Sequence, residues 1–439
     1  MIRLRSLAAL FALTALTTGP LGCGSGTRDR GSTDPVVRSS GSGTGAGDPI
    51  AVTARKTRVK PKPISKTIER GLAWLAQRQL KGGGWGQGDE AAGMGHTMDG
   101  MRDVANVADT SMALLAFLRA GHAPNHGEYR DTVQRGLDYV LAEVEASDTD
   151  GLAVTKVTGT RVQAKIGPYA DTFAALMVLT EARGQMRDGI ANARLDAALK
   201  KVVKKIEQSQ RADGTWDGQG WAPVLSQAMA AKGMNRAAQN GIAVSEEVLD
   251  RLEQQAHSQV NTTTRTFAAD GAAGVGLYGG AAASAAARDS ATTRKAKAED
   301  MKARAKKAGG KELKSPDAPT KAEIAAAEAR ATQSDAAASG VEGALIANLE
   351  NPQFIAGFGN NGGEEFLSYM MISETLVMKG GDEWARWDKA ITSLVGGVQN
   401  EDGSWTGHHC ITGRTFCTAA ALLVLMGDRT PAPEAVIAT

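Results

Sequence analysis

The chain has 439 residues, 42% of them hydrophobic and 22% charged, so it is long enough to bury one or two sizeable cores. Its formal net charge is only +2, which gives no electrostatic argument for a nucleic-acid partner. Composition therefore indicates a globular protein that does not bind nucleic acid.

Residues 1–22 have the composition of a targeting segment. Arg3 and Arg5 form a basic start, and the apolar run 7–16 that follows is too short to span a bilayer. Small residues and then Cys23 come next. This pattern resembles a bacterial lipoprotein signal peptide, with simple secretion as the alternative. The resemblance implies that Cys23 is lipidated and anchors the chain in the cell envelope, on a periplasmic or outer-membrane face.

Residues 23–60 are predicted to be a flexible tether, because Gly, Ser, Thr, Arg and Pro dominate and no hydrophobic period appears. If Cys23 carries lipid, Cys410 and Cys417 remain as one pair in an oxidising compartment. The six residues between Cys410 and Cys417 form a loop that can close a disulfide if the backbone turns. Two free buried thiols are the alternative, and both interpretations stay open.

Three stretches share a Gln-x₃-Gly-x-Trp pattern, and internal repeats of this kind take priority over any other fold prediction. The three copies are Gln79…Gly83…Trp85, Gln210…Gly214…Trp216 and Gln399…Gly403…Trp405. An amphipathic helix is predicted before each copy and a more apolar helix after it. With a degenerate copy near 144–151, the chain advances in units of about 65 residues.

In chain order, the expected helical pairs begin after 61. The predicted helices cover 64–75, 107–118, one starting near 129, 169–181, 195–208, 222–232, 245–259, 365–378, 383–398 and 415–426. Residues 281–340 interrupt the fourth pair with an Ala/Lys/Glu-rich stretch that has almost no Leu, Ile, Val or aromatic residues. We expect this insertion to be disordered or a solvated helix. The repeat region is thus divided into 61–280 and 341–430, followed by a tail, 431–439.

The stretch Arg70-Gly71-x₂-Trp74-Leu75-x₃-Gln79-x₃-Gly83-x-Trp85 resembles the QW motif of the prenyltransferase/squalene oxidase repeat family. That family includes squalene and oxidosqualene cyclases and protein prenyltransferases. The resemblance implies an all-α fold, an α/α toroid of about five helical hairpins around a central cavity. It also implies a structural role for the Gln, Gly and Trp of the three copies, which tie outer helices together.

The catalytic motifs of that family are incomplete in this chain. The Asp-x-Asp-Asp motif of the cyclases has no match, since the nearest string, 148–151, ends in Gly. The prenyltransferase zinc site implies Asp, Cys and His ligands, and the corresponding positions here hold Glu364, Phe366 and Cys417. A phenylalanine cannot ligate zinc.

Polar side chains remain where the turns enter the apolar helices. Asp109 and Asp171 occupy equivalent places, and helix N-capping is the structural interpretation of both. The functional interpretation is that both acids face one cavity mouth, where they bind a cation or perform acid/base chemistry.

His408, His409 and Cys410 form the densest chemical cluster, and Glu364 and Glu365 are expected on a neighbouring helix start. Imidazoles, a thiolate and carboxylates suit zinc, with His408, His409 and Glu364 as the candidate ligands. A nucleophilic Cys-His pair and simple loop packing are the alternatives.

The sequence favours a non-catalytic envelope lipoprotein whose toroid cavity or rim binds a lipid, glycan or protein ligand. The alternative is a divergent enzyme of the terpene cyclase/prenyltransferase type, with a non-standard site around His408, His409 and Cys410. Zinc is the cofactor that such a site would use. Few aromatic residues are left over from the QW motifs to stabilise a carbocation, which favours the binding module.

Overall fold

The computed structural model describes residues 56–90, 98–309, 318–359 and 361–433. These residues are predominantly helical, with one short antiparallel pair of strands, β1 (Val260–Asn261) and β2 (Thr266–Phe267). The predicted all-α class is therefore confirmed. The predicted signal peptide, Cys23 and most of the tether lie outside the described residues. Over the part of the chain that is described, no helix is both long and apolar enough to cross a membrane.

A set of helices with buried surfaces forms the centre of the described chain, and we call them the core helices. They are α2 (Val107–Ala120), α5 (Ala170–Ala182), α7 (Val224–Gln239), α9 (Gly276–Gly309), α12 (Gly363–Lys379) and α14 (Arg414–Leu425). Every residue of α5 is buried. A helix that is apolar on all sides has to be enclosed by other helices.

A second set of helices exposes one face, and we call these the peripheral helices. They are α1 (Lys66–Gln77), α3 (Arg130–Ala146), α6 (Gly189–Ser209), α8 (Glu246–Ser258), α10 (Lys321–Asn348) and α13 (Gly381–Gly396). The short elements are η1 (Asp99–Met101), α4 (Arg161–Ile166), α11 (Pro352–Ala356) and η2 (Gly427–Arg429). In α1 the buried positions recur at helical spacing, as the amphipathic pattern predicts.

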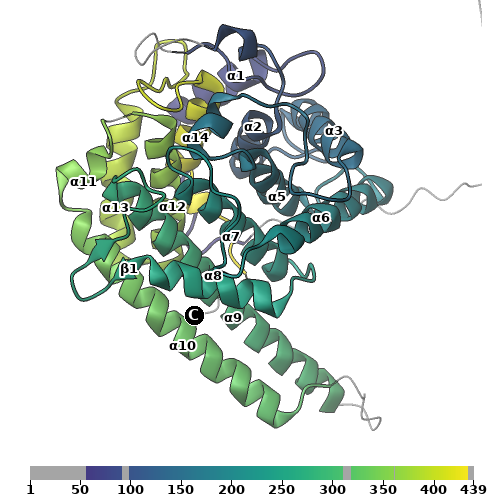
Figure 1. Cartoon of the computed structure of the whole chain (residues 1–439). Helices are drawn as coiled ribbons and strands as arrows, with labels where there is room; N and C mark the ends of the chain where they lie inside the picture. The colour runs from purple at the N-terminus through teal and green to yellow at the C-terminus, as the bar shows by residue number, and fades with distance from the viewer. Residues whose placement is uncertain (1–55, 91–97, 310–317, 360, 434–439) are drawn as a thin grey trace, which may run out of the picture. The chain divides into compact units, whose positions relative to one another are not determined.

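The core helices contact one another in chain order (Figure 1). Helix α2 packs on α5, α5 on α7, α7 on α9, α9 on α12, α12 on α14, and α14 packs back on α2. The peripheral helices lie against them: α3 contacts α2, α6 contacts α5, α8 and α10 contact α9, and α13 contacts α12 and α14. Each core helix therefore has two core neighbours.

Helix ends lie where the sequence signals place them. The Ser65 side chain accepts a hydrogen bond from Ile68 N and caps α1, and Gly121 ends α2 with φ at 94°. A positive φ of this size favours glycine, which has no Cβ to clash.

The three Gln-x₃-Gly-x-Trp copies make the same hydrogen bonds. Gln79, Gln210 and Gln399 donate from Nε2 to the carbonyl of the glycine four residues on, at 2.7, 3.1 and 2.8 Å. Their side-chain oxygens accept from Arg135, Arg251 and Arg70 of the peripheral helix that follows, the last being α1. Trp85, Trp216 and Trp405 donate from Nε1 to a carbonyl ten residues earlier, at 2.7, 2.8 and 2.8 Å. The motif therefore joins successive peripheral helices, and its last copy joins α13 to α1.

Close packing at two glycines accompanies these bonds. A Cβ on Gly136 would lie 2.8 Å from Trp85 Cζ3 and 2.7 Å from Leu114 Cδ2. A Cβ on Gly71 would lie 3.0 Å from Trp405 Cζ3. Each tryptophan of these two motifs thus fills the space that a missing side chain leaves on the neighbouring helix.

We predict that Gly136→Ala lowers the free energy of unfolding by about 1–3 kcal/mol, because overpacking a filled core forces neighbours to move. Chemical denaturation monitored by circular dichroism measures the change. The control is Gly343→Ala in α10, where a Cβ meets nothing within 4 Å. That variant should gain about 0.5–1 kcal/mol from helix propensity. Equal effects at both glycines would contradict the packing argument.

The segment 281–340 agrees only in part with its prediction as a disordered or solvated helix: residues 321–333 are a mostly exposed helix, whereas residues 281–298 are largely buried. It lies mostly in α9 and α10, which pack against each other (Figure 1). The half of α9 next to the core is buried, including Ala281, Ala285 and Ala291. Alanine-rich surfaces bury because short side chains let helix backbones approach closely, so the absence of Leu and Ile does not prevent packing. The segment supplies a core helix and a peripheral helix, so the described chain has six such pairs where about five were expected.

Candidate functional site

The predicted carboxylates lie at the starts of core helices and are all buried. Asp109 is in the first turn of α2, Asp171 in that of α5, and Glu364 and Glu365 in that of α12. We call these four residues the carboxyl cluster. Their burial in an all-helical core is unusual for acids and requires compensating hydrogen bonds or protonation.

Asp171 caps a neighbouring helix. Its Oδ1 accepts from the backbone N–H of Ala108 at 2.9 Å, at the start of α2. Its Oδ2 accepts from Gln163 Nε2 at 2.8 Å. Burial raises the pKa of Asp171, and these hydrogen bonds oppose that rise. Asp171 is therefore a helix cap, as one interpretation predicted, but it caps a neighbouring helix: the free backbone N–H from which it accepts lies at the start of α2.

Asp109 is only half satisfied. Its Oδ2 accepts from Asn106 Nδ2 at 2.7 Å, whereas its Oδ1 has no hydrogen-bond partner among the described residues. The N-cap of α2 is Asn106 itself, which accepts from Asp109 N at 2.9 Å. Burial raises the pKa of Asp109 to about 7, and the charge of Asp171 adds to the rise.

Glu365 holds several segments together. Its side chain accepts from Tyr278 Oη at 2.5 Å, from Phe358 N at 3.0 Å and from Gly362 N at 2.9 Å. His409 Nε2 lies 3.4 Å from the same carboxylate. Because α9, α12 and two loops meet at Glu365, this residue has a positioning role.

Glu364 points to a different loop and, like Asp109, has a free oxygen. One oxygen accepts from Ile411 N at 3.0 Å, and Oε1 has no hydrogen-bond partner among the described residues. Burial raises the pKa of Glu364 to about 8, the charge of Glu365 adds to the rise, and Lys165 opposes it. Glu364 is therefore a protonated acid near neutral pH.

The predicted zinc ligands do not come together. His408 is exposed and donates its backbone N–H to Asn361 O at 2.8 Å, whereas His409 is buried against Glu365. Across the described ranges, no group of three His, Cys, Asp or Glu residues could hold a metal ion. The set His408, His409 and Glu364 therefore does not fit the tetrahedral site that zinc requires.

Of the two interpretations of the cysteine pair, the structure has the second: Cys410 and Cys417 are both free and buried, and no disulfide joins them. Cys417 Sγ contacts Ile411 O at 3.4 Å, in donor geometry. Burial and the charge of Glu364 raise the pKa of Cys410 to about 12 and that of Cys417 well above its ordinary value. A thiol with a raised pKa carries little thiolate, so neither cysteine is an activated nucleophile.

An aromatic surface beside the carboxyl cluster was missed from the sequence. It consists of the rings of Trp221 and Phe358, which pack on the buried rings of Tyr278 and His409. Phe358 lies edge-on to Trp221 at 5.1 Å between centroids and to His409 at 5.2 Å. Tyr278 lies 6.1 Å from Trp221. Phe358 is 49% exposed, and its aromatic neighbours come from three other segments, so only tertiary contacts assemble the surface.

An ion pair supports the loops around this site. Glu90 accepts from Arg161 Nε at 2.8 Å and Nη2 at 3.1 Å, and from Thr412 Oγ1 at 2.8 Å. Burial opposes ionisation of Glu90, but these hydrogen bonds and one from Met98 N outweigh it and lower its pKa. Glu90 is therefore an ionised carboxylate, unlike Glu364.

A second polar group, also missed, lies toward the opposite ends of the core helices. We call it the ion network, and its members are Arg119, Glu181, Lys232, Arg236, Asp289 and Glu374. Glu374 accepts a hydrogen bond from Arg236 at 2.7 Å and forms ion pairs with Lys232 at 2.9 Å and with Arg119 at 3.0 Å. The three cations and three anions balance, and they link α2, α5, α7, α9 and α12.

A sequence signal for the ion network does exist. Arg119, Glu181 and Glu374 each follow an acid of the carboxyl cluster by ten residues (119 − 109, 181 − 171 and 374 − 364). Charged residues that occupy equivalent positions in otherwise apolar helices are expected to form ion pairs with one another when the helices pack, because an unpaired buried charge is costly.

No protein-family model matches the chain, and no curated protein is significantly similar to it.

Proposed function

We propose that this chain is a non-catalytic binding module that recognises a carbohydrate at the aromatic surface beside the carboxyl cluster. In this proposal it belongs to the prenyltransferase/squalene oxidase repeat type and is held in the cell envelope by lipid on Cys23. The observation that carries the binding proposal is the half-exposed Phe358 ring, set edge-on against Trp221 next to buried polar groups.

Three structural facts support the α/α toroid part of the proposal. The contact order of the core helices returns to α2. The three motifs make equivalent hydrogen bonds, and Gln399 and Trp405 join the last peripheral helix to Arg70 and Gly71 of the first. A repeat that closes on itself needs no polar capping units.

The aromatic surface suits a sugar better than an acyl chain. Rings that present both an apolar face and nearby polar groups are typical of sites for small amphipathic ligands. An acyl chain needs a long apolar groove, whereas the exposed apolar area here is one phenylalanine and part of one tryptophan. The Trp221 backbone is fixed, since its N–H and that of Ala222 donate to Lys165 O at 2.9 and 2.8 Å. With the backbone fixed, only the two side-chain torsions of Trp221 have to be ordered on binding, which limits the loss of conformational entropy.

The chemistry of the cluster favours binding over catalysis. The two thiols have raised pKa values, and Glu365 and Asp171 accept hydrogen bonds that hold loops and helix ends. The second candidate is a divergent enzyme, favoured by the raised pKa of Glu364, because an acid protonated near neutral pH is suited to general acid catalysis.

We predict that Trp221→Ala and Phe358→Ala each weaken carbohydrate binding by about tenfold or more, the effect expected for a central aromatic contact. Isothermal titration calorimetry of the full chain with neutral hexasaccharides, cellohexaose and chitohexaose, measures the affinity. The control is Ile190→Ala, which removes a side chain that is 86% exposed on α6. Binding that is equal in all four proteins would contradict the proposal.

Recovery of the sugar after incubation distinguishes the two candidates. An intact hexasaccharide supports the binding module. A sugar that wild type cleaves and Glu364→Gln binds but does not cleave would establish the enzyme instead. Binding of oleate, lost in Trp221→Ala, with no binding of either sugar, would replace the carbohydrate by a lipid.

A further inference from the structure

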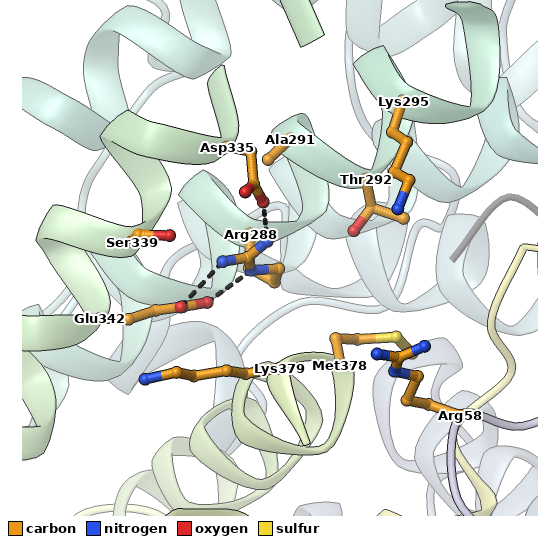
Figure 2. A pocket seen from close by; sticks show the side chains of 10 residues that line it. All are labelled: Arg58, Arg288, Ala291, Thr292, Lys295, Asp335, Ser339, Glu342, Met378 and Lys379. Atoms are coloured by element: carbon orange, nitrogen blue, oxygen red, sulfur yellow. Dashed lines mark hydrogen bonds and ion pairs between the residues drawn. The ribbon is translucent and has the colours of Figure 1, made fainter. Parts of the chain in front are cut away.

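A pocket lies toward the end of α12 that is remote from the carboxyl cluster (Figure 2). Its volume is about 250 Å³, and its walls come from α9, α10, the end of α12 and the segment that precedes α1. That segment is fixed: Thr57 pairs with Pro431, and Ala432 N donates to Lys56 O at 3.0 Å. Lys379 follows Glu364 by 15 positions on one helix, so the two sites are about 22 Å apart along it.

The pocket lining carries an excess of positive charge. Four cations, Arg58, Arg288, Lys295 and Lys379, face two acids, Asp335 and Glu342, which gives a net charge of +2 (4 − 2). Figure 2 shows these side chains around one space, with Lys295 on the α9 side and with Arg58 and Lys379 across from Arg288.

Arg288 and the acids form a fixed base for the pocket. The Arg288 guanidinium binds both oxygens of Glu342, at 2.5 and 2.8 Å, and contacts Asp335 at 2.6 Å. The Glu342 side chain is fully buried. Burial of Arg288 opposes its charge, but the contacts with Glu342 and Asp335 outweigh this effect and raise the pKa of Arg288. The Arg288–Glu342 pair is therefore neutral and structural. Of the remaining lining charges, Arg58, Lys295 and Lys379 contribute +3 and Asp335 contributes −1, which gives the excess of +2. Lys379 Nζ also lies 3.7 Å from Glu383, which is outside the lining.

The remaining lining fits a small anion with an organic group attached. Thr292 and Ser339 bring hydroxyl groups that can donate, and Met378 and Ala291 form an apolar wall. The volume admits a phosphate with a short substituent and excludes a folded partner. Cations from three separate elements match an anion with several charged oxygens better than a carboxylate, and a phosphate monoester carries close to two negative charges at neutral pH.

We propose that this pocket binds a phosphate group through Arg58, Lys295 and Lys379. The phosphate is carried by a lipid headgroup or by a soluble phosphorylated molecule. Arg58 belongs to the segment predicted as the tether, which makes a membrane headgroup one of these two sources. The site is independent of the carbohydrate proposal, because it shares no residue with the carboxyl cluster or the aromatic surface.

The first experiment is isothermal titration calorimetry of the full chain with inorganic phosphate, at pH 7.5 and constant ionic strength set with chloride. We expect saturable binding, and an affinity about tenfold lower in Lys295→Gln and in Lys379→Gln, because each removes one charge-assisted hydrogen bond. The matched control is Lys297→Gln, two residues from Lys295 on α9, whose side chain pairs with Glu246 of α8. Its affinity should equal that of wild type. Melting temperatures close to wild type show that the variants are folded.

Vesicle sedimentation identifies the source of the phosphate. Binding to vesicles of phosphatidylglycerol and phosphatidylcholine, weakened by both pocket variants and not by Lys297→Gln, supports the headgroup. Phosphate binding that depends on the pocket, with vesicle binding equal in all variants, supports the soluble source. The proposal is overturned if neither phosphate nor vesicle binding distinguishes the pocket variants from Lys297→Gln.

Discussion

Glu374→Gln is expected to lower the free energy of unfolding by about 3–5 kcal/mol, the effect of removing one partner from a buried ion pair. The Glu374 carboxylate lies within 3.0 Å of three cations, Arg119, Lys232 and Arg236, and its side chain is 2% exposed. The neutral amide leaves the ion network with three cations and two anions in a medium that solvates charge poorly. Urea denaturation at pH 7 measures the loss.

Two comparisons test the explanation. Glu299→Gln removes an exposed partner of Lys302, and such surface pairs contribute about 0–1 kcal/mol. Adding Lys232→Met to Glu374→Gln restores two cations and two anions, so the double variant should be less destabilised than the sum of the two single variants. Additive effects would show that Glu374 stabilises the core by packing and not by charge.

The ion network also sets the acid stability. Although burial opposes ionisation, the charges of Arg236, Lys232 and Arg119 hold the pKa of Glu374 far below its usual range. The contribution of the pairs is complete above the ordinary pKa of about 4.5 and is lost as the pH falls toward the native pKa. The stability difference between wild type and Glu374→Gln should thus be constant between pH 5 and 8 and should shrink below pH 4.5.

The helices were predictable because burial imposes a period on the sequence. Ile68, Leu72 and Leu75 line one face of α1, and Ser65 and Gly121 mark helix ends by rules that depend on local geometry. The burial of residues 281–298 was not predicted, because their amphipathic signal is weak: in α9 the buried positions are held largely by alanine. In a sequence, an alanine-rich helix that packs closely in a core cannot be distinguished from an alanine-rich helix that is exposed to solvent.

The candidate site was predictable only in part. Asp109, Asp171, Glu364 and Glu365 were placed at helix starts, where the structure has them, because the turn-to-helix pattern is local. The aromatic surface was not predicted, since Trp221 and Phe358 are far apart in the sequence and meet only through the fold. The spacing of the cysteine pair left a bridge and two free thiols open, and only the fold decides between them: Cys417 is buried in α14 and its thiol contacts Ile411 O.

Glu364→Gln is expected to change how stability depends on pH. Burial raises the native pKa of Glu364 to about 8, from an ordinary value of 4.5. Between these values the native state binds the proton more tightly than the unfolded state, so the stability of wild type falls as the pH rises and levels off above pH 8. The amide cannot ionise. The stability of the variant relative to wild type should therefore increase between pH 4.5 and 8, by on the order of 3–5 kcal/mol.

Urea denaturation at half-unit steps from pH 4.5 to 9 measures this difference, and two other variants give the comparison. The stability of Asp109→Asn relative to wild type should also increase with pH, but the increase should end near pH 7, because the native pKa of Asp109 is about 7. The stability of Glu374→Gln relative to wild type should not change over pH 5–8. The native pKa of Glu374 is lowered, so its effect on the pH dependence of stability has the opposite sign and appears only below pH 4.5. A Glu364→Gln difference that is equally flat would mean that Glu364 is ionised in the native protein at pH 7. The general acid hypothesis would then be lost, whereas carbohydrate binding at Trp221 and Phe358 would be unaffected, because the exposed ring and its neighbour need no proton from Glu364.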